Sequence, residues 1–177
     1  LPSSTQIISL NGKSFKEICS EILKLGEQLD AEKKAIQHVN KAIERKDKLD
    51  QLPKHSHRVL CLEWIDPYFS AGHWVPEQIE MAGFHSAIGK KGEISRVLTI
   101  DEIVASEPDV IAVICCGYKI EENRSFVKTL KTNSEINFLK PFLSKNVYAF
   151  DSDSFFSRPT TRIIEGAEQL RDAILNT

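Results

Sequence analysis

The stretch RVLCLEW, residues 58–64, is an apolar run from Val59 onwards that only Glu63 interrupts. A strand that is apolar on both faces is typical of a parallel sheet covered by helices on its two sides. Two later runs have the same character, DVIAVICC at residues 109–116 and NVYAF at residues 146–150. We therefore expect three buried strands that lie parallel to one another.

Segments with helical periodicity separate these strands. The expected helices cover residues 76–82, 100–106, 121–130 and 160–175. Pro76 suits the first turn of the first helix and Gly83 suits its end, while TIDE at residues 99–102 has the capping-box pattern that opens the second. Strands that alternate with helices predict an α/β fold, in which a parallel, Rossmann-like sheet is flanked by helices and joined by right-handed crossovers.

The N-terminal part of the chain has a different pattern. TQIISLNG, residues 5–12, reads as a strand that ends in a turn, and residues 14–29 have the periodicity of an amphipathic helix. After a break at Gly26 and Asp30, Asp30 is the expected N-cap of a second helix over residues 31–49, which would be about 30 Å long. Its apolar positions form one narrow stripe of Ile36, Val39 and Ile43. This second helix is therefore long and mostly polar.

Composition narrows the class of protein. The chain has 177 residues, of which 41% are hydrophobic and 27% charged, as in globular proteins and unlike disordered or fibrous ones. A net charge of −2 offers no basic stripe, so we expect no nucleic-acid partner. No apolar run approaches the roughly 20 residues that span a bilayer. The first residue is Leu1 rather than Met, which indicates a processed or trimmed product.

Aromatic residues gather in the segments that follow the three strands. These segments are residues 64–74, 117–123 and 151–158, and their aromatic residues are Trp64, Tyr68, Phe69, Trp74, Tyr118, Phe155 and Phe156. The carboxyl ends of parallel strands form one edge of the sheet, and ligands of open α/β folds bind in the crevice outside it. We therefore expect a binding surface for a large, flat and partly apolar ligand. Trp64, which is nearest to its strand, is expected in the core instead.

Three long segments resemble one known family. They are RVLCLEWIDPYFSAGHWVPEQIEMAG at residues 58–83, IDEIVASEPDVIAVICCGY at residues 100–118 and FSRPTTRIIEGAEQL at residues 156–170. The family is that of the class III substrate-binding proteins of ABC importers, which bind cobalamin, haem or ferric siderophores, and the chain looks most like its cobalamin-binding branch. The resemblance implies a non-enzymatic periplasmic or extracytoplasmic receptor that delivers a small-molecule metal chelate to a transporter permease.

The resemblance also implies a division of the chain, because the family has two α/β lobes that hold the ligand between them and are joined by a long helix. Residues 1–12 would be the last strand of the first lobe, residues 13–53 a helical segment with the interlobe helix, and residues 54–177 the C-terminal α/β lobe. Almost the whole first lobe is absent, so we expect a fragment of a longer protein; a naturally short form that dimerises is the alternative. Membrane association would come only through the transporter or a lipid anchor on the longer protein.

The resemblance suggests which loop residues touch the ligand. They are Tyr68, Phe69, His73, Trp74, Tyr118, Phe155 and Phe156. The aromatic rings would pack against a corrin ring or a similar macrocycle, although rings at this edge also serve as peripheral core. His73 has an imidazole nitrogen that suits cobalt or haem iron, and the alternative is a hydrogen-bonded turn histidine. No resident cofactor or protein-held metal ion is expected; the ligand is cobalamin or a related corrinoid, with haem and ferric siderophores as alternatives.

Asp101 and Glu102 have two interpretations that are compatible with each other. In the family, an acidic residue on each lobe docks into a basic pocket of the permease, and the resemblance implies this role at or beside Asp101. Acidic residues in a first turn also cap a helix and interact favourably with its dipole. We expect Glu102 to cap the helix and Asp101 to face outwards.

An enzyme is the alternative to a receptor. A cysteine-dependent or hydrolase-like α/β domain would use Cys115 or Cys116 with His73, but a nucleophilic thiol needs a partner base and a depressed pKa. In apolar runs such thiols are more often small buried hydrophobes. The chain has no G-x-S-x-G elbow, no Gly-rich phosphate loop and no H-E-x-x-H motif, and its strand-to-helix turns have no dinucleotide-binding glycine fingerprint.

Overall fold

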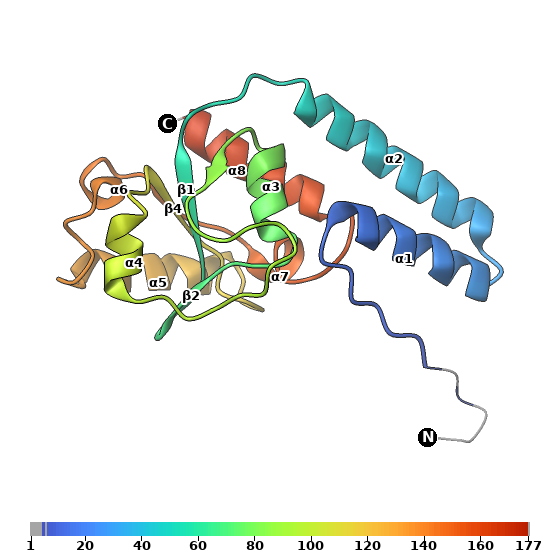
Figure 1. The fold of residues 1–177 in the computed structure, drawn as a ribbon, viewed down its shortest axis with the longest axis horizontal. Helices are drawn as coiled ribbons and strands as arrows, with labels where there is room; N and C mark the ends of the chain where they lie inside the picture. Colours follow the sequence, from blue (N-terminus) through green and yellow to red (C-terminus); the bar gives the residue numbers. More distant parts are fainter. Residues whose placement is uncertain (1–4, 6, 177) are drawn as a thin grey trace.

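A computed structural model describes residues 5 and 7–176, which form a sheet with helices on both faces (Figure 1). The strands are β1 (Arg58–Ile65), β2 (Tyr68–Ser70), β3 (His85–Ser86), β4 (Val110–Val113) and β5 (Val147–Ala149). Strands β1, β4 and β5 run parallel, as expected, and the structure places them side by side in that order. The other edge of β1 pairs in parallel with β3 near its start and antiparallel with β2 near its end. The two short strands β2 and β3 had no signal in the sequence pattern.

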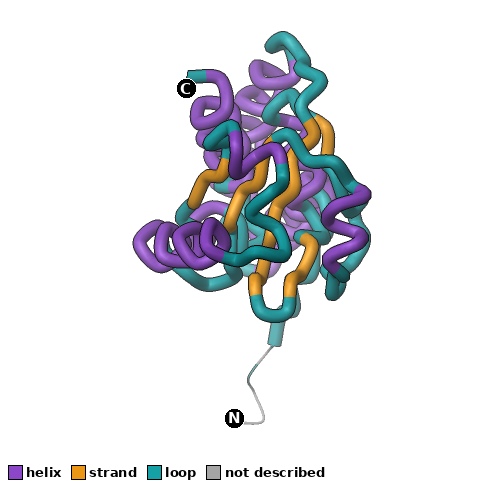
Figure 2. Tube along the Cα trace, turned by 90° about the vertical axis from the view of Figure 1, so that its left-hand side faces the viewer, coloured by secondary structure: helices purple, strands orange, loops and turns teal. Residues whose placement is uncertain are grey.

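The central strands are buried on both faces because the helices cover the sheet on two sides (Figure 2). These helices are α3 (Val75–Met81), α4 (Ile100–Ala105), α5 (Ile120–Thr132), α6 (Lys140–Leu143), α7 (Ser152–Phe155) and α8 (Ile163–Leu175). Successive residues of a strand point to opposite faces, so Val59 and Cys61 join one core cluster while Leu60 and Leu62 join the other. The predicted α/β class is confirmed.

Local signals placed several helix ends correctly. Thr99 and Glu102 form the expected capping box: the Thr99 hydroxyl accepts from the Glu102 amide at 3.2 Å, and the Glu102 carboxylate accepts from the Thr99 amide at 2.9 Å. Pro76 lies in the first turn of α3. Gly83 follows that helix with a φ of +90°, which a residue with a side chain rarely adopts. These three signals act over one turn of backbone, so no distant contact is needed to make them right.

Helices α1 (Phe15–Gln28) and α2 (Glu32–Asp50) form a hairpin that lies beside the sheet (Figure 1). Asp30 does not cap α2 as expected; it takes a φ of +51° in the turn, and Ala31 precedes the helix without a side-chain cap. Gly26 does not break α1 either. A Cβ at this glycine would lie 2.4 Å from the Ala35 Cβ, so Gly26 lets the two helices approach closely at this point.

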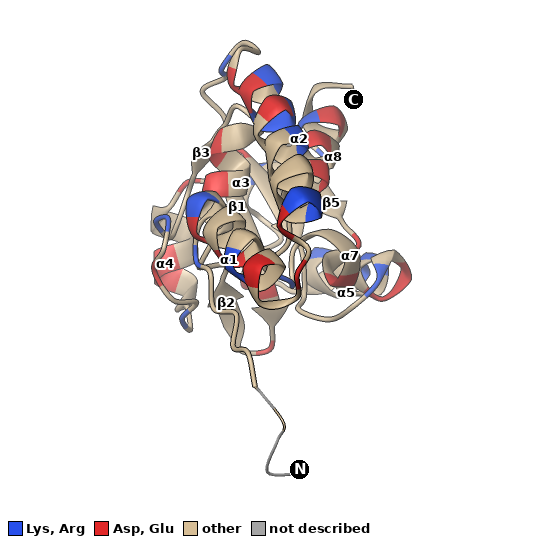
Figure 3. Ribbon diagram, turned by 90° about the vertical axis from the view of Figure 1, so that its right-hand side faces the viewer, with Lys and Arg blue, Asp and Glu red and all other residues tan. Residues whose placement is uncertain are grey.

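The buried face of α2 keeps one residue of the predicted stripe, Val39, and leaves out the other two. Small side chains face α1 and the lobe, and the buried residues of α2 are Ala35, Val39, Ala42 and Leu49. Ile36 and Ile43 are 50% and 41% exposed instead. Bands of acidic and basic residues alternate with tan positions along both helices (Figure 3). Close approach of two helices favours alanine and glycine at the contact, which turns the larger isoleucines away from it.

Polar contacts fasten this helical hairpin to the lobe. The Arg45 guanidinium donates to Glu165 at 2.6 Å and to Glu168 at 2.7 Å, both on α8. His38 lies 2.9 Å from the Thr161 hydroxyl. The α1–α2 hairpin therefore packs as part of the lobe that it precedes.

The predicted strand over residues 5–12 does not form. Residue 5 and residues 7–12 have neither helix nor strand structure and run away from the sheet (Figure 1), while residues 1–4 and 6 lie outside the described residues. A strand needs the backbone of a neighbour to satisfy its N–H and C=O groups, and this segment lies beside none of the five strands. The assignment of residues 1–12 to a first lobe stays a prediction.

Candidate ligand-binding site

The hairpin of β1 and β2 decides which aromatic residues face outwards. The register shifts between Leu62 and Trp64, so that Trp64 pairs with Phe69 and Ile65 pairs with Tyr68. Such a bulge turns the residues that follow it, and here it ends the run of fully buried positions in β1. Trp64 is consequently 37% exposed, and its indole N–H donates to the Asp66 carbonyl at 2.9 Å. The expectation that Trp64 lies in the core is wrong.

Tyr68 takes the place in the core that was expected for Trp64. It is 9% exposed and packs in the cluster that includes Leu60 and Leu62. Its hydroxyl accepts a hydrogen bond from Asn133 at 2.8 Å, and burial is the main cause that raises the pKa of this phenol. The pleat of β2 therefore points the Tyr68 side chain inwards, and its role as a ligand contact stays a prediction.

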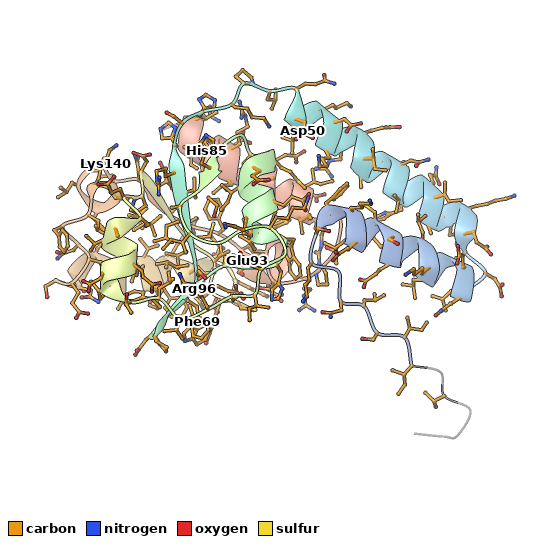
Figure 4. The ribbon with its side chains drawn as sticks, viewed as in Figure 1. Asp50, Phe69, His85, Glu93, Arg96 and Lys140 are labelled. Atoms are coloured by element: carbon orange, nitrogen blue, oxygen red, sulfur yellow. The ribbon has the colours of Figure 1, made fainter. Side chains whose placement is uncertain are left out.

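Two hollows adjoin at the carboxyl ends of the parallel strands. The first has a volume of about 210 Å³ and is lined by His73, Trp74, Ser152, Phe156 and Ser157 among others. The second has a volume of about 310 Å³ and is lined by Glu63, Trp64, Pro67, Phe69 and Cys116. Glu63 and Cys116 line both hollows and so stand at the border between them. Figure 4 shows Phe69 at this end of the molecule with Glu93 and Arg96, and His85 and Lys140 at the opposite end.

His73 is held in a fixed and unusual conformation. Its φ is +55°, which costs a residue with a side chain about 1–3 kcal/mol and persists only where the surroundings impose it. Here they do, since its amide donates to the Glu93 carbonyl at 2.6 Å and its carbonyl accepts from the Gly92 amide at 2.8 Å. The imidazole ring lies 5.8 Å from the ring of Trp74. The first hollow thus has a well-placed imidazole on its wall.

The other predicted aromatic contacts differ in their access to the hollows. Trp74 lines the first hollow and donates its indole N–H to the Phe156 carbonyl at 2.9 Å. Phe156 is 3% exposed and contributes to the floor of that hollow, whereas Phe155 packs against the core outside the lining of both hollows. Tyr118 stands 5.6 Å behind Trp64, ring to ring, so it supports that side chain.

The two adjacent cysteines have opposite environments. Cys115 is fully buried, and burial raises the pKa of its thiol to about 12. Cys116 is exposed and lines both hollows, so the expectation of two buried thiols is wrong for Cys116. Gly117 has a φ of +79°, which makes the sharp turn expected there. Side chains alternate between the two faces of a strand. Extending this alternation one residue beyond Cys115 would have placed the Cys116 side chain at the site.

Glu63 is the site residue that the sequence pattern missed most clearly. Its carboxylate accepts a hydrogen bond from the Ser95 hydroxyl at 2.6 Å and borders both hollows. The signal available in the sequence was one acidic residue near the end of an otherwise apolar strand. The bulge exposes the residues at that end of β1, so the Glu63 side chain can reach the hollows.

Asp101 and Glu102 lie as expected at the start of α4. Asp101 is exposed, while Glu102 caps the helix and meets Arg96 at 2.7 Å. The hydrogen bond from the Thr99 amide, followed by the one from Arg96, lowers the pKa of Glu102 below its ordinary value. The preceding segment pairs with β2 through a bridge between Val97 and Phe69, and Phe69 lines the second hollow.

Two kinds of feature are absent from the described residues. They contain no group of three or more His, Cys, Asp and Glu side chains placed to hold a metal ion. Among them there is also no helix with the length and apolar character needed to cross a bilayer.

Comparison with known proteins gives a family and a fold. Residues 3–154 match the family model described as periplasmic binding protein. No curated protein sequence matches the chain. An ABC transporter substrate-binding protein from Listeria monocytogenes has 18% identity and a TM-score of 0.85, with 96% of this chain and 68% of that chain covered.

Two further solved structures have a similar fold. One is a complex with a ligand, and the other is of a protein named for its ligand. Staphylococcus aureus IsdE complexed with haem has 20% identity and a TM-score of 0.82, with 97% of this chain and 69% of that chain covered. The periplasmic vitamin B12 binding protein BtuF of Vibrio cholerae has 17% identity and a TM-score of 0.69, with coverages of 97% and 65%. Such identities establish the fold alone. The chain spans between 65% and 69% of the length of these three structures.

The matched family consists of solute-binding proteins, which are not enzymes. The resemblance to substrate-binding proteins of ABC importers is therefore confirmed at the level of the family. The enzyme alternative falls with it, and the buried Cys115, whose thiol has a pKa of about 12, would in any case be a poor nucleophile.

Proposed function

Because the chain belongs to the periplasmic binding protein family, we propose that it is part of the substrate-binding component of an ABC-type importer and binds cobalamin or a related metal chelate. The observation that carries the proposal is the pair of adjoining hollows at the carboxyl ends of the strands, with aromatic and polar walls. Haem and ferric siderophores are the other candidate ligands. The protein would act outside the cytoplasm.

The walls of the two hollows suit the two kinds of surface that a metal macrocycle presents. Trp64, Pro67 and Phe69 offer carbon-rich faces on the second hollow, where a flat ring would lie. His73 and Ser157 offer nitrogen and oxygen on the first hollow, where the polar groups at the rim of such a ligand would find hydrogen bonds. Proteins of this fold include ones described with haem, vitamin B12 and an Fe3+-hydroxamate transport system, which supports the ligand class.

The proposed arrangement of the whole receptor follows the family. Residues 31–49 would form the interlobe helix, residues 54–177 one lobe, and the ligand would lie between this lobe and a second one. Asp101 is exposed on the first turn of α4, whereas Glu102 is engaged by Thr99 and Arg96. We therefore place the contact with the permease at Asp101.

The test is a titration of this chain with aquacobalamin, haemin and a ferric hydroxamate, followed by visible absorbance and calorimetry. We expect binding of at least one chelate, and Trp64→Ala is expected to weaken it about tenfold, which corresponds to about 1.4 kcal/mol. Phe138→Ala is the matched control, since Phe138 is also an exposed aromatic residue, 55% accessible, and lies in a separate hollow with Lys140. Absence of binding by all three chelates, both to this chain and to a longer protein that supplies the second lobe, would overturn the ligand class.

A further inference from the structure

We propose that the two hollows select a chelate by the chemistry of its edge: they bind edges that carry neutral amides or ammonium groups and repel edges that carry carboxylates. Glu63 is the residue that determines this specificity, and the hydroxyl of Ser157 supports it. The inference rests on the proposed function, because it concerns the same hollows. It deepens that function by separating amide-bearing corrinoids from haem, whose edge carries two carboxylates.

The charge of the walls is the first argument. Glu63 borders both hollows, and its carboxylate accepts a hydrogen bond from the Ser95 hydroxyl at 2.6 Å. No lysine or arginine among the described residues lines either hollow. None of the ion pairs in the described part of the chain includes Glu63. A ligand that spans both hollows therefore crosses a carboxylate that no neighbouring cation balances.

The lack of cations at these walls is not a consequence of composition. The chain has 23 lysine and arginine residues against 25 aspartate and glutamate residues. Cations do line two other hollows, and these are Lys46, Lys54 and Lys91 in one and Arg58 and Lys140 in the other. Arg158 comes directly after Ser157, but its guanidinium donates to Asp153 at 2.6 Å and its side chain is 59% exposed. A carboxylate in the two hollows would thus find no cation on the walls that the described residues form.

The second argument is that the serine hydroxyls of the first hollow have already given up their protons to hydrogen bonds. The buried Ser152 hydroxyl donates to the Ile114 carbonyl at 2.8 Å and lies 2.8 Å from the Ser157 hydroxyl. Because Ser152 has a single proton to donate, the proton between the two hydroxyls comes from Ser157. The Gly117 amide donates to the Ser157 oxygen at 2.9 Å. Ser157, the more accessible of the two serines, is left with a lone pair for a ligand and no proton.

Other donors of the lining residues are engaged as well. The Trp74 indole N–H donates to the Phe156 carbonyl at 2.9 Å, and the Cys116 amide donates to the Glu63 carbonyl at 3.1 Å. The His73 imidazole can donate through one ring nitrogen when it is neutral, and the Cys116 thiol is a weak donor. The oxygen atoms of Glu63 and of the serines are therefore the fixed polar feature of these walls, and they accept hydrogen bonds.

These acceptors favour one kind of ligand edge over another. A carboxylate is negative and only accepts hydrogen bonds, so it would meet like charge at Glu63 and a lone pair at Ser157. A primary amide has two N–H donors and an ammonium group has three, so either can satisfy both oxygens. Specificity of this kind comes from repelling the wrong edge as well as from binding the right one. A corrinoid carries amides at its edge, which fits the walls.

The experiment uses two series of ligands in which only the edge changes. In the first, cyanocobalamin is compared with its separated monocarboxylic acids, in which one side-chain amide is hydrolysed to a carboxylate. In the second, a linear ferric trihydroxamate with a terminal ammonium group is compared with its neutral acetylated form and with its succinylated form, which ends in a carboxylate. Calorimetry on this chain measures each Kd. In the series that binds, we expect a carboxylate form to bind at least about tenfold more weakly than its amide or ammonium partner.

Three variants assign the preference to its residues. Glu63→Gln keeps an oxygen that can accept from Ser95 but removes the charge, so the preference against the carboxylate form should fall to about threefold or less. Glu121→Gln is the matched control and should keep the full preference, because Glu121 loses the same charge, is 71% exposed and lines neither hollow. Ser157→Ala removes an acceptor and frees the Gly117 N–H, so it should narrow the preference by a smaller factor. Circular dichroism of each variant checks that the fold is intact.

The contrary outcomes separate this inference from the proposed function. Equal binding of the carboxylate and amide forms would overturn the inference while the proposed binding function stands. An unchanged preference in Glu63→Gln, or an equal narrowing in Glu121→Gln, would overturn the role of Glu63. Tighter binding of haemin than of cyanocobalamin would overturn the preferred edge. If no chelate binds to this chain or to a longer protein that supplies the second lobe, the inference fails together with the proposed ligand class.

Discussion

The β1–β2 hairpin and the α1–α2 hairpin differ in every local feature, yet the sequence pattern failed in the same way in both. Strand β1 and helices α1 and α2 were placed close to their true positions and β2 was not foreseen, and in each hairpin at least one residue was assigned to the wrong side. Trp64 is exposed and Tyr68 buried in the first. Ile36 is exposed and Ala35 buried in the second. The comparison teaches that the hydrophobic pattern predicts where a helix or strand forms. The distance to the neighbouring backbone then decides which side chains of that element are buried against its neighbour.

The largest expected effect comes from the buried tyrosine of the β hairpin. Tyr68→Ala removes a ring from the core, and such a loss costs about 3–5 kcal/mol of unfolding free energy. Trp64→Ala, on the other strand of the same hairpin, should cost far less because Trp64 is 37% exposed. Urea unfolding of both variants measures the difference. Equal losses would show that the hairpin does not separate a core ring from a surface ring.

The α hairpin is expected to respond to added volume where its helices approach closely. Gly26→Leu places a side chain where a Cβ would already be 2.4 Å from the Ala35 Cβ, so the helices must move apart. Overpacking of this kind costs about 1–3 kcal/mol. Ile36→Ala on the outer face is the control and should change stability by no more than about 0.5 kcal/mol. A larger effect of Ile36→Ala would mean that the outer face is also packed.

A smaller effect is expected where the α hairpin is fastened to the lobe. Arg45→Met keeps the length of the side chain but removes its ion pairs with Glu165 and Glu168. These groups are between 33% and 41% exposed, so we expect a loss of about 0.5–1 kcal/mol that shrinks in high salt. Thermal unfolding at low and high salt tests it. A loss that salt does not alter would point to packing by the arginine stem instead.

The smallest effect concerns the acidic turn of α4. The pKa of Glu102 is lowered in the folded state, chiefly by the Thr99 amide, so its charge adds stability at pH values above its ordinary pKa. That contribution is lost as the pH falls through the lowered folded-state pKa. Glu102→Gln should therefore be less stable than the native chain at neutral pH and converge with it in acid. Stability curves that stay parallel down to low pH would contradict this linkage.

Prediction from sequence went furthest where the signal is local. The capping box at Thr99 and Glu102, the proline in the first turn of α3 and the turn at Gly117 were all foreseeable, because each depends on a few adjacent residues. The cluster of aromatic residues at one edge of the sheet was foreseeable too, since the carboxyl ends of parallel strands share an edge. Which of those rings reach the hollows was not, because a bulge of one residue reverses inside and outside.

What the sequence determined by itself is the α/β class, the three buried parallel strands and the edge of the sheet at which aromatic residues gather. These features follow from the hydrophobic periodicity of the sequence, which recurs along the whole length of each helix or strand. The tertiary structure alone decided that Trp64, Glu63 and Cys116 border the site while Tyr68 belongs to the core. It likewise decided that alanines rather than isoleucines join α2 to α1. Such choices depend on how closely two backbones approach, and that distance is set by residues far apart in the chain.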